Sequence, residues 1–259
     1  MKIEKPQNKV YLVGCGLGDV ELLTIKAYNT IQKVDVILYD YLISQEILDI
    51  IPQYTKKVFV GKKKGHHSLS QEEINKIILK YAKQGKSVAR LKSGDPFVFG
   101  RGSEELYDMV KYGIKTEVIP GISSSISGSS QAGIPITARH YSAGFTVVTA
   151  HLKGNTLNLD WVDILNKENH TVVVLMGLSK TKEIQEKALN MGINQNKDCA
   201  IVSNASRTNQ KVVTCKLNEL HESSKGFESP AILVFGDVVK YKQEIEELKS
   251  LEGSVKITV

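Results

Sequence analysis

The sequence predicts an α/β protein made of two α/β domains with mainly parallel or mixed sheets. Short apolar runs typical of buried strands alternate with amphipathic helical patterns along its 259 residues. The alternation stops at Pro120–Ser125, a small, polar and turn-rich segment, and then resumes. We therefore expect an N-terminal α/β domain with a glycine loop over residues 8–120, a C-terminal α/β domain over 121–243 and a charged tail over 244–259.

Strands of the first domain are expected near residues 10–13, 34–39, 57–60, 87–91 and 115–119. Ser70 and Glu73 predict a capping box for a helix that runs to Gln84, and Gly85 ends it. Strands of the second domain are expected near residues 145–150, 171–176, 199–202, 211–215 and 231–235. The Glu/Lys-rich segment 241–251 is expected to form a surface helix.

The composition favours an anionic small-molecule ligand. Lys and Arg number 34 against 28 Asp and Glu, a net charge of +6, and 62–64 is a run of lysines. A basic chain also suits nucleic acid, but we find no recognised nucleic-acid motif and expect no such partner. An apolar segment of signal-peptide or membrane-spanning length is not evident, so we expect a cytoplasmic protein without a membrane partner.

The cysteines do not follow a metal or disulfide pattern. Cys15, Cys199 and Cys215 have neither CxxC spacing nor a clustered histidine. We expect reduced, structural thiols and no bound metal.

Residues 90–105, RLKSGDPFVFGRGSEE, are the most informative stretch. The glycines that follow a buried strand allow the backbone to approach a ligand where a Cβ would block it. Asp95 before Pro96 places a carboxylate on a turn. Phe97 and Phe99 are expected to form apolar walls and to anchor the loop. These features predict a binding site at the end of the strand.

Arg101 stands between two glycines, just before a helix that Glu104 and Glu105 open. It is placed to reach a ligand and to bind a carboxylate through its planar fork. The alternative is a surface arginine that pairs with Glu104 or Glu105.

The loop GCGLGD at 14–19 follows another apolar strand. It resembles the dinucleotide-binding fingerprint, but Asp19 stands where the third glycine is needed, and its carboxylate would repel a pyrophosphate. Asp19 is better suited to cap the helical pattern of 22–31. The loop then suits a ligand without phosphate, such as a nucleoside joined to an amino acid.

The chain carries in order GCGLGD, VILYDYLIS (36–44), VGKKKGHHS (60–68), RLKSGDPFVFGRGSEE, VIPGISS (118–124), AGIPIT (132–137), MGL (176–178) and SPAILVFGDVV (229–239). This set resembles the uroporphyrinogen-III C-methyltransferases, which are tetrapyrrole methylases. The resemblance implies two domains that enclose S-adenosyl-L-methionine in a cleft between them, and a homodimer. It also implies two successive methyl transfers to uroporphyrinogen III, giving precorrin-2 by way of precorrin-1, for siroheme or cobalamin synthesis, with S-adenosyl-L-homocysteine as the by-product.

The resemblance also assigns residues. Asp40 and Lys62 match the family's proton acceptor and donor, while Arg101 and Glu104 match substrate-side residues. Positions that line the family's cofactor pocket are matched by Leu17, Ser93, Gly94, Asp95, Val98, Ser123, Ser124, Met176, Ala205 and Ala231. The alternatives are a turn-capping Asp40, a solvated Lys62 and a Met176 packed in the core.

The chain departs from the family pattern at Leu17, Tyr41, Ser93, Ala138, His140, Ser203 and Ala205. Leu17 replaces the usual proline and Ser93 the usual glycine, which alters loop stiffness. The changes at Tyr41, Ala138 and His140 remove charges near the substrate side, so they bear on which tetrapyrrole is bound.

Other functions stay open. A methylase of the same fold could act on a later corrin precursor, on diphthamide or on ribosomal RNA, although such enzymes should lack the VGKxxGHH and FGRG segments. A nicotinamide-dependent dehydrogenase needs an acidic residue after its second strand, and Asp40 could mimic it. An RNA-binding module is the third class, and its affinity for RNA would depend strongly on salt.

Overall fold

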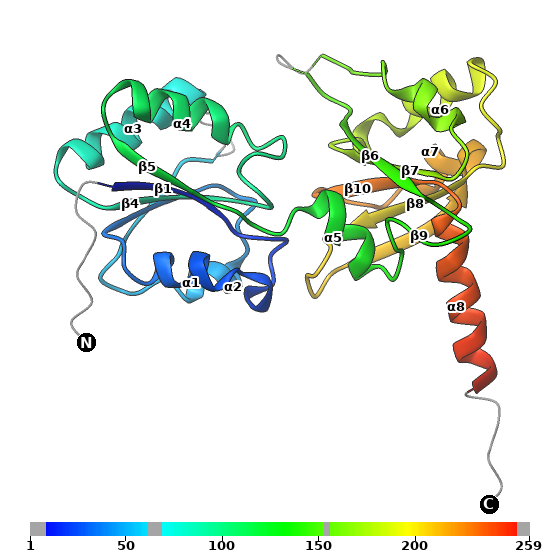
Figure 1. The fold of residues 1–259 in the computed structure, drawn as a ribbon, viewed down its shortest axis with the longest axis horizontal. Coiled ribbons are helices and arrows are strands. Elements are labelled where there is room, and N and C mark those ends of the chain that lie inside the picture. The colour runs from blue at the N-terminus through cyan, green and yellow to red at the C-terminus, as the bar shows by residue number, and fades with distance from the viewer. Residues whose placement is uncertain (1–8, 62–68, 153–155, 253–259) are drawn as a thin grey trace, which may run out of the picture. The chain divides into compact units, whose positions relative to one another are not determined.

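The computed structural model describes residues 9–61, 69–152 and 156–252. The chain divides into two compact units, Met1–Ser123 (unit 1) and Ser124–Val259 (unit 2). Each unit is a sheet with helices on both faces (Figure 1). Among the described helices, none is both long and apolar enough to cross a membrane.

Unit 1, in its described part, has a five-stranded parallel sheet in the order β3-β2-β4-β1-β5. Helices α1 and α2 cover one face and α3 and α4 the other (Figure 1). The elements are β1 (Lys9–Gly14), η1 (Val20–Leu22), α1 (Ile25–Ile31), β2 (Val36–Tyr39), α2 (Gln45–Asp49), β3 (Lys56–Phe59), α3 (Gln71–Lys83), β4 (Val88–Lys92), α4 (Gly102–Lys111) and β5 (Lys115–Ile119).

Strand β1 explains how one sheet holds two apolar layers. Val10 and Leu12 pack against the side of α3 and α4, whereas Tyr11 and Val13 pack against the side of α1 and α2. Successive side chains of a strand point to opposite faces, so a strand buried on both sides is a continuous apolar run. This is why the sequence pattern located the central strands.

Unit 2, in its described part, has a mixed sheet in the order β6-β7-β10-β8-β9. Strands β6 and β7 are parallel, while β10 is antiparallel to both β7 and β8, and β9 to β8. The elements are α5 (Ser124–Gln131), β6 (Gly144–Thr149), η3 (Val162–Asn166), β7 (His170–Leu175), η4 (Leu178–Lys180), α6 (Thr181–Asn190), β8 (Asp198–Ser203), β9 (Lys211–Lys216), η5 (Leu217–Glu219), α7 (Leu220–Ser223), β10 (Ala231–Phe235) and α8 (Val238–Glu252).

The core of unit 2 also has two layers. Ile184 and Leu220, from α6 and α7, pack on one face of the sheet with Phe235 of β10. On the other face, Val238 at the start of α8 packs with Val234 of β10. All strands expected from the sequence are present, and the predicted mixture of parallel and mixed sheets is confirmed.

The helix caps confirm one expectation and correct another. The Ser70 hydroxyl accepts the Glu73 N–H at 3.2 Å, and the Glu73 carboxylate accepts the Ser70 N–H at 2.6 Å. Gly85 ends this helix with φ 79°. Asp19 caps the short turn η1, and Thr24 caps α1, so the helix expected from residue 22 begins at Ile25.

Candidate active site

A glycine junction joins the ends of three neighbouring strands in unit 1. Gly14 ends β1, Gly94 follows β4 and Gly121 follows β5. Gly16 and Gly94 exchange backbone hydrogen bonds of 3.3 and 2.7 Å. A Cβ on Gly14 would lie 2.8 Å from the Gly94 carbonyl oxygen, and a Cβ on Gly121 would clash with the same oxygen. Glycine is therefore required, and the junction is made of main chain.

The glycine junction lies at the switch point of the sheet. Neighbouring strands β1 and β4 are followed by helices on opposite faces, α1 and α4 (Figure 1). In open α/β sheets, ligands bind in the crevice outside the carboxyl ends of such strands. Leu17, Ser93 and Gly94 follow β1 and β4 at this edge, so the structure brings these predicted cofactor residues together.

Asp95 links two of the loops at this edge. One carboxylate oxygen accepts the Phe97 N–H at 2.8 Å, and the other accepts the Gly121 N–H at 3.1 Å. The carboxylate thus fixes the loop after β4 to the loop after β5. Val98 closes the same turn, with its N–H 3.3 Å from the Asp95 carbonyl oxygen.

The two phenylalanines do not anchor the loop, contrary to the sequence expectation. Phe97 and Phe99 are 54% and 45% exposed. Backbone contacts hold the loop instead. The Gly102 N–H donates to the Pro96 carbonyl at 3.0 Å, and a Cβ on Gly102 would clash with that carbonyl.

Arg101 and Glu104 form an exposed, bidentate ion pair at the start of α4. Arg101 Nε and Nη2 donate to the two Glu104 carboxylate oxygens at 2.9 and 2.7 Å. The hydrogen bond to Glu104 raises the pKa of Arg101. Arg101 has φ 59°, a left-handed conformation that is uncommon outside glycine. The pair matches the alternative of a surface arginine, yet its exposure leaves both side chains accessible to a ligand.

Asp40 follows β2 at the same carboxyl edge. One oxygen accepts Arg90 Nη2 at 2.7 Å, and the other accepts the Leu42 N–H at 3.0 Å. Asp40 therefore does cap a turn, and it also belongs to an ion pair. Lys62, its expected partner in proton transfer, lies outside the described residues.

Behind Asp40 lies a buried charge cluster, defined here as Asp40, Arg90, Lys92 and Glu105. Glu105 is fully buried, and the side chains of Arg90 and Lys92 are 6% exposed. Lys92 Nζ is 2.9 Å from Glu105, and Arg90 Nε is 3.4 Å from it. Burial lowers the pKa of Lys92, although Glu105 acts in the opposite direction.

Sequence reasoning missed the roles of Arg90, Lys92 and Glu105. The strand is recognisable as buried, but its charges at alternate positions, 90 and 92, also point to one face. Glu105 looks, like Glu104, as if it only opens the helix. The useful signal is that two cations on one side of a buried strand require an anion close by.

Predicted cofactor residues of unit 2 share one edge of its sheet. Met176 follows β7, Ala205 follows β8, and Ala231 begins β10. The antiparallel register pairs Ala231 with Ser203 and Ile232 with Leu175, so these ends coincide. Helix α5, which Ser124 begins, packs on β10. Ser123, the last residue of unit 1, precedes it.

Met176 is not a core residue. It is 47% exposed and has φ 58°. A left-handed backbone conformation costs free energy at any residue other than glycine, and residues strained in this way cluster at functional sites. Asn204 and Ser206, which flank Ala205, also have positive φ values, 51° and 67°. The interpretation of Met176 as core packing is therefore wrong.

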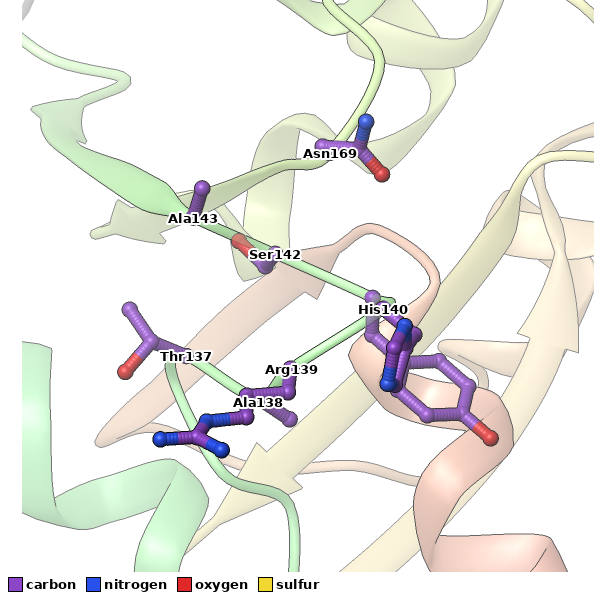
Figure 2. A pocket seen from close by; sticks show the side chains of 8 residues that line it. Thr137, Ala138, Arg139, His140, Ser142, Ala143 and Asn169 are labelled. Carbon is purple, nitrogen blue, oxygen red and sulfur yellow. The ribbon is translucent and has the colours of Figure 1, made fainter.

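A surface cavity of about 560 Å³ lies at the opposite edge of the unit 2 sheet. Ala143 and Asn169, which precede β6 and β7, line it together with Ala138, Arg139 and His140 (Figure 2). His140 has φ 72°. Two of the departures from the family pattern, Ala138 and His140, thus lie away from Met176, Ala205 and Ala231.

The cysteines are not activated for chemistry. Cys15, Cys199 and Cys215 are free thiols. Burial raises the pKa of Cys15 to about 12, so it is not a thiolate at neutral pH. In the described part of the chain, no group of three or more His, Cys, Asp or Glu side chains is arranged to hold a metal ion.

The parallel sheet, its switch point and the glycine junction place the chain among α/β proteins that bind small ligands at strand ends. Residues 9–221 match the family model of the tetrapyrrole (corrin/porphyrin) methylases. The chain belongs to this family.

The relatives include the siroheme synthases of Photobacterium profundum and Pseudoalteromonas translucida. The first is 42% identical over 250 residues, 96% of this chain and 53% of the relative. The second is 41% identical over 243 residues, 93% of this chain and 51% of the relative. The chain thus spans about half the length of the curated relatives that it matches.

Solved structures agree with this family. The uroporphyrin-III C-methyl transferase of Thermus thermophilus superposes with a TM-score of 0.79 at 36% identity, over 90% of this chain and 99% of that chain. The same enzyme has been solved with S-adenosyl homocysteine. A cobalt precorrin-4 methyltransferase superposes with a TM-score of 0.77 at 24% identity, over 90% of this chain and 96% of that chain, and shows the fold alone.

Proposed function

We propose that the chain is an S-adenosyl-L-methionine-dependent methyltransferase that methylates uroporphyrinogen III twice, giving precorrin-1 and then precorrin-2, for siroheme or cobalamin synthesis. The observation that carries the proposal is the similarity over 99% of the Thermus thermophilus enzyme, which also forms a complex with S-adenosyl homocysteine. The ordered motifs from GCGLGD to SPAILVFGDVV support it.

The glycine junction fits such a cofactor. Its main-chain floor at the switch point is packed too closely to admit a Cβ, and Asp19 disfavours a pyrophosphate at the first loop. We assign cofactor contacts in unit 1 to Leu17, Ser93, Gly94, Asp95, Val98 and Ser123. In unit 2 we assign them to Ser124, Met176, Ala205 and Ala231.

When bound, S-adenosyl-L-methionine supplies a methyl group on a sulfonium, which is an activated electrophile whose thioether leaves without an acid. The chain itself must orient the tetrapyrrole so that a ring carbon faces that methyl group, and orientation of this kind lowers a barrier by several kcal/mol. It must also accept the proton that the ring loses after methylation. We assign proton acceptance to Asp40, whose ion pair with Arg90 holds it at the carboxyl edge.

The substrate carries eight carboxylates, which a guanidinium binds in a bidentate manner. We assign this role to Arg101, with Glu104 orienting it in the absence of substrate. Lys62, as proton donor, completes the assignment. The family resemblance also leads us to propose a homodimer in the cytoplasm, and light scattering coupled to gel filtration would measure the mass of the assembly.

The test is mass analysis of uroporphyrinogen III incubated anaerobically with the protein and S-adenosyl-L-methionine. We expect two methyl additions and two equivalents of S-adenosyl-L-homocysteine per tetrapyrrole. Absence of any methylated tetrapyrrole under reducing conditions contradicts the proposal. Methylation of a later corrin precursor in place of uroporphyrinogen III would move the assignment to another tetrapyrrole methylase.

A further inference from the structure

The Glu105 carboxylate is the buried centre of the charge cluster in unit 1. Three side chains from two elements hold it: Gln71 Nε2 of α3 donates to it at 3.0 Å, Arg90 Nε of β4 lies at 3.4 Å, and Lys92 Nζ of β4 lies at 2.9 Å. A carboxylate removed from water needs such compensation. Glu105 therefore has a fixed position that solvent does not disturb.

The Arg90 guanidinium connects the buried Glu105 to Asp40, which is partly exposed. Its Nε faces Glu105, its Nη1 donates to the Leu91 carbonyl at 2.6 Å, and its Nη2 donates to Asp40 at 2.7 Å. A planar fork held at three of its nitrogens has little freedom to rotate. The direction of the bond to Asp40 is consequently set from the buried side.

Asp40 accepts the hydrogen bond from the outer nitrogen of Arg90, Nη2. Arg90 holds one carboxylate oxygen and the Leu42 N–H holds the other, while the Asp40 side chain keeps 20% of its surface exposed. The carboxylate is fixed at both oxygens but still reaches solvent. Arg90 thus lies between Asp40 and Glu105 and contacts both.

We propose that Glu105 is a positioning residue for methyl transfer, which acts through Arg90 to orient the Asp40 carboxylate. This inference rests on the proposed function and deepens it. The cluster carries two positive and two negative charges, and buried pairs of this kind are often no more stabilising than apolar side chains of the same volume. Stability alone therefore does not explain why the cluster is present, whereas orientation of Asp40 does.

The test is a double-mutant cycle on turnover of uroporphyrinogen III, with wild type, Glu105→Gln, Asp40→Asn and the double variant. Asp40→Asn should lower turnover about 100-fold or more, since it removes the proton acceptor. Glu105→Gln should lower it by roughly 10-fold to 100-fold, as expected for a misplaced catalytic group. The double variant should be no slower than Asp40→Asn, because Glu105 acts through Asp40. Affinity for S-adenosyl-L-homocysteine should stay unchanged throughout.

Two further proteins separate positioning from folding. Glu105→Gln combined with Lys92→Met keeps the cluster neutral and provides a folded protein if Glu105→Gln alone unfolds. Asp198→Asn is the matched control, because Asp198 is also a buried carboxylate, paired with Lys216 at 2.7 Å and Lys240 at 3.5 Å at the start of β8. It should lose stability but keep wild-type turnover at a temperature where it is folded.

The outcomes separate the inference from the function on which it rests. Losses that multiply in the double variant overturn the inference alone, as does wild-type turnover in either the Glu105→Gln or the charge-neutral variant. Wild-type turnover in Asp40→Asn also overturns it, while methyl transfer itself stands. A wild-type protein that methylates no tetrapyrrole overturns both.

Discussion

Glu104 and Glu105 are neighbours in the first turn of α4, yet they lie in opposite environments. Glu104 is 54% exposed and pairs with the exposed Arg101. Glu105 is 0% exposed and pairs with the buried Arg90 and Lys92. Both carboxylates lie beside an arginine, and the largest difference between them is burial.

Access to water decides what an ion pair contributes to the molecule. Water screens the Arg101–Glu104 pair and can replace either partner, so the pair contributes about 1 kcal/mol or less and can open for a ligand. Water cannot replace a partner of Glu105, so removal of one leaves an uncompensated buried charge. The exposed pair is free to serve binding, and the buried one sets geometry.

The largest expected effect concerns stability. Glu105→Ala should lower the free energy of unfolding by about 3–5 kcal/mol, because Arg90 and Lys92 lose their buried counter-ion. Glu104→Ala should cost about 1 kcal/mol or less. Urea unfolding of both variants measures the difference, and equal costs would show that burial does not distinguish the two carboxylates.

The exposed pair should matter for substrate. Arg101→Lys keeps the charge but loses the planar fork, so kcat/KM for uroporphyrinogen III should fall about 30-fold, equivalent to about 2 kcal/mol. Affinity for S-adenosyl-L-homocysteine should be nearly unchanged. Full activity, or equal losses for cofactor and substrate, would remove Arg101 from the substrate side.

Asp95 differs from both glutamates, because its carboxylate pairs with no cation among the described residues and accepts hydrogen bonds from two backbone N–H groups. Asp95→Ala should weaken S-adenosyl-L-homocysteine binding by about 1–3 kcal/mol while the fold stays intact, because the Phe97 and Gly121 N–H groups lose their acceptor. Calorimetry measures this affinity. Asn194→Ala, which removes a similar turn contact to Asn196 in unit 2, should leave it unchanged. Unchanged affinity in Asp95→Ala would exclude Asp95 from the site.

The smallest effect is a pH dependence of the buried cluster. The pKa of Lys92 is lowered from the ordinary 10.5, chiefly by burial, so between the two values the unfolded chain binds more protons than the folded one. Stability should therefore rise with pH in this window, as the cost of burying the ammonium is relieved. The unfolding free energy of wild type relative to Lys92→Met should increase as the pH rises towards 10.5. A difference that is constant over this range contradicts the expectation.

Much of the fold could be predicted because burial leaves periodic patterns. The β1 run is apolar on both faces, and the capping box at Ser70 is a local signal within four residues. The predicted start of α1 is wrong because Asp19 and Thr24 are both good caps, and the choice between them depends on the turn η1. Local sequence does not reveal that turn.

The candidate site could be predicted where main chain forms it and not where distant side chains meet. The glycines at 14, 94 and 121 are visible in the sequence, and so is the turn at Asp95. The contact of Glu105 with Gln71 joins residues that are 34 positions apart. The exposure of Met176 could not be inferred either, because an apolar strand precedes it and the residue type does not reveal its positive φ.

The glycine junction has a consequence for how this chain tolerates sequence drift. A binding floor made of main chain has the same atoms whatever the side chains around it are. The departures from the family pattern expected from the sequence at Leu17 and Ser93 should thus leave the floor unchanged, since neither contributes the atoms that Gly14, Gly94 and Gly121 bring together. The close packing of the floor thus constrains three positions that have no side chain to vary.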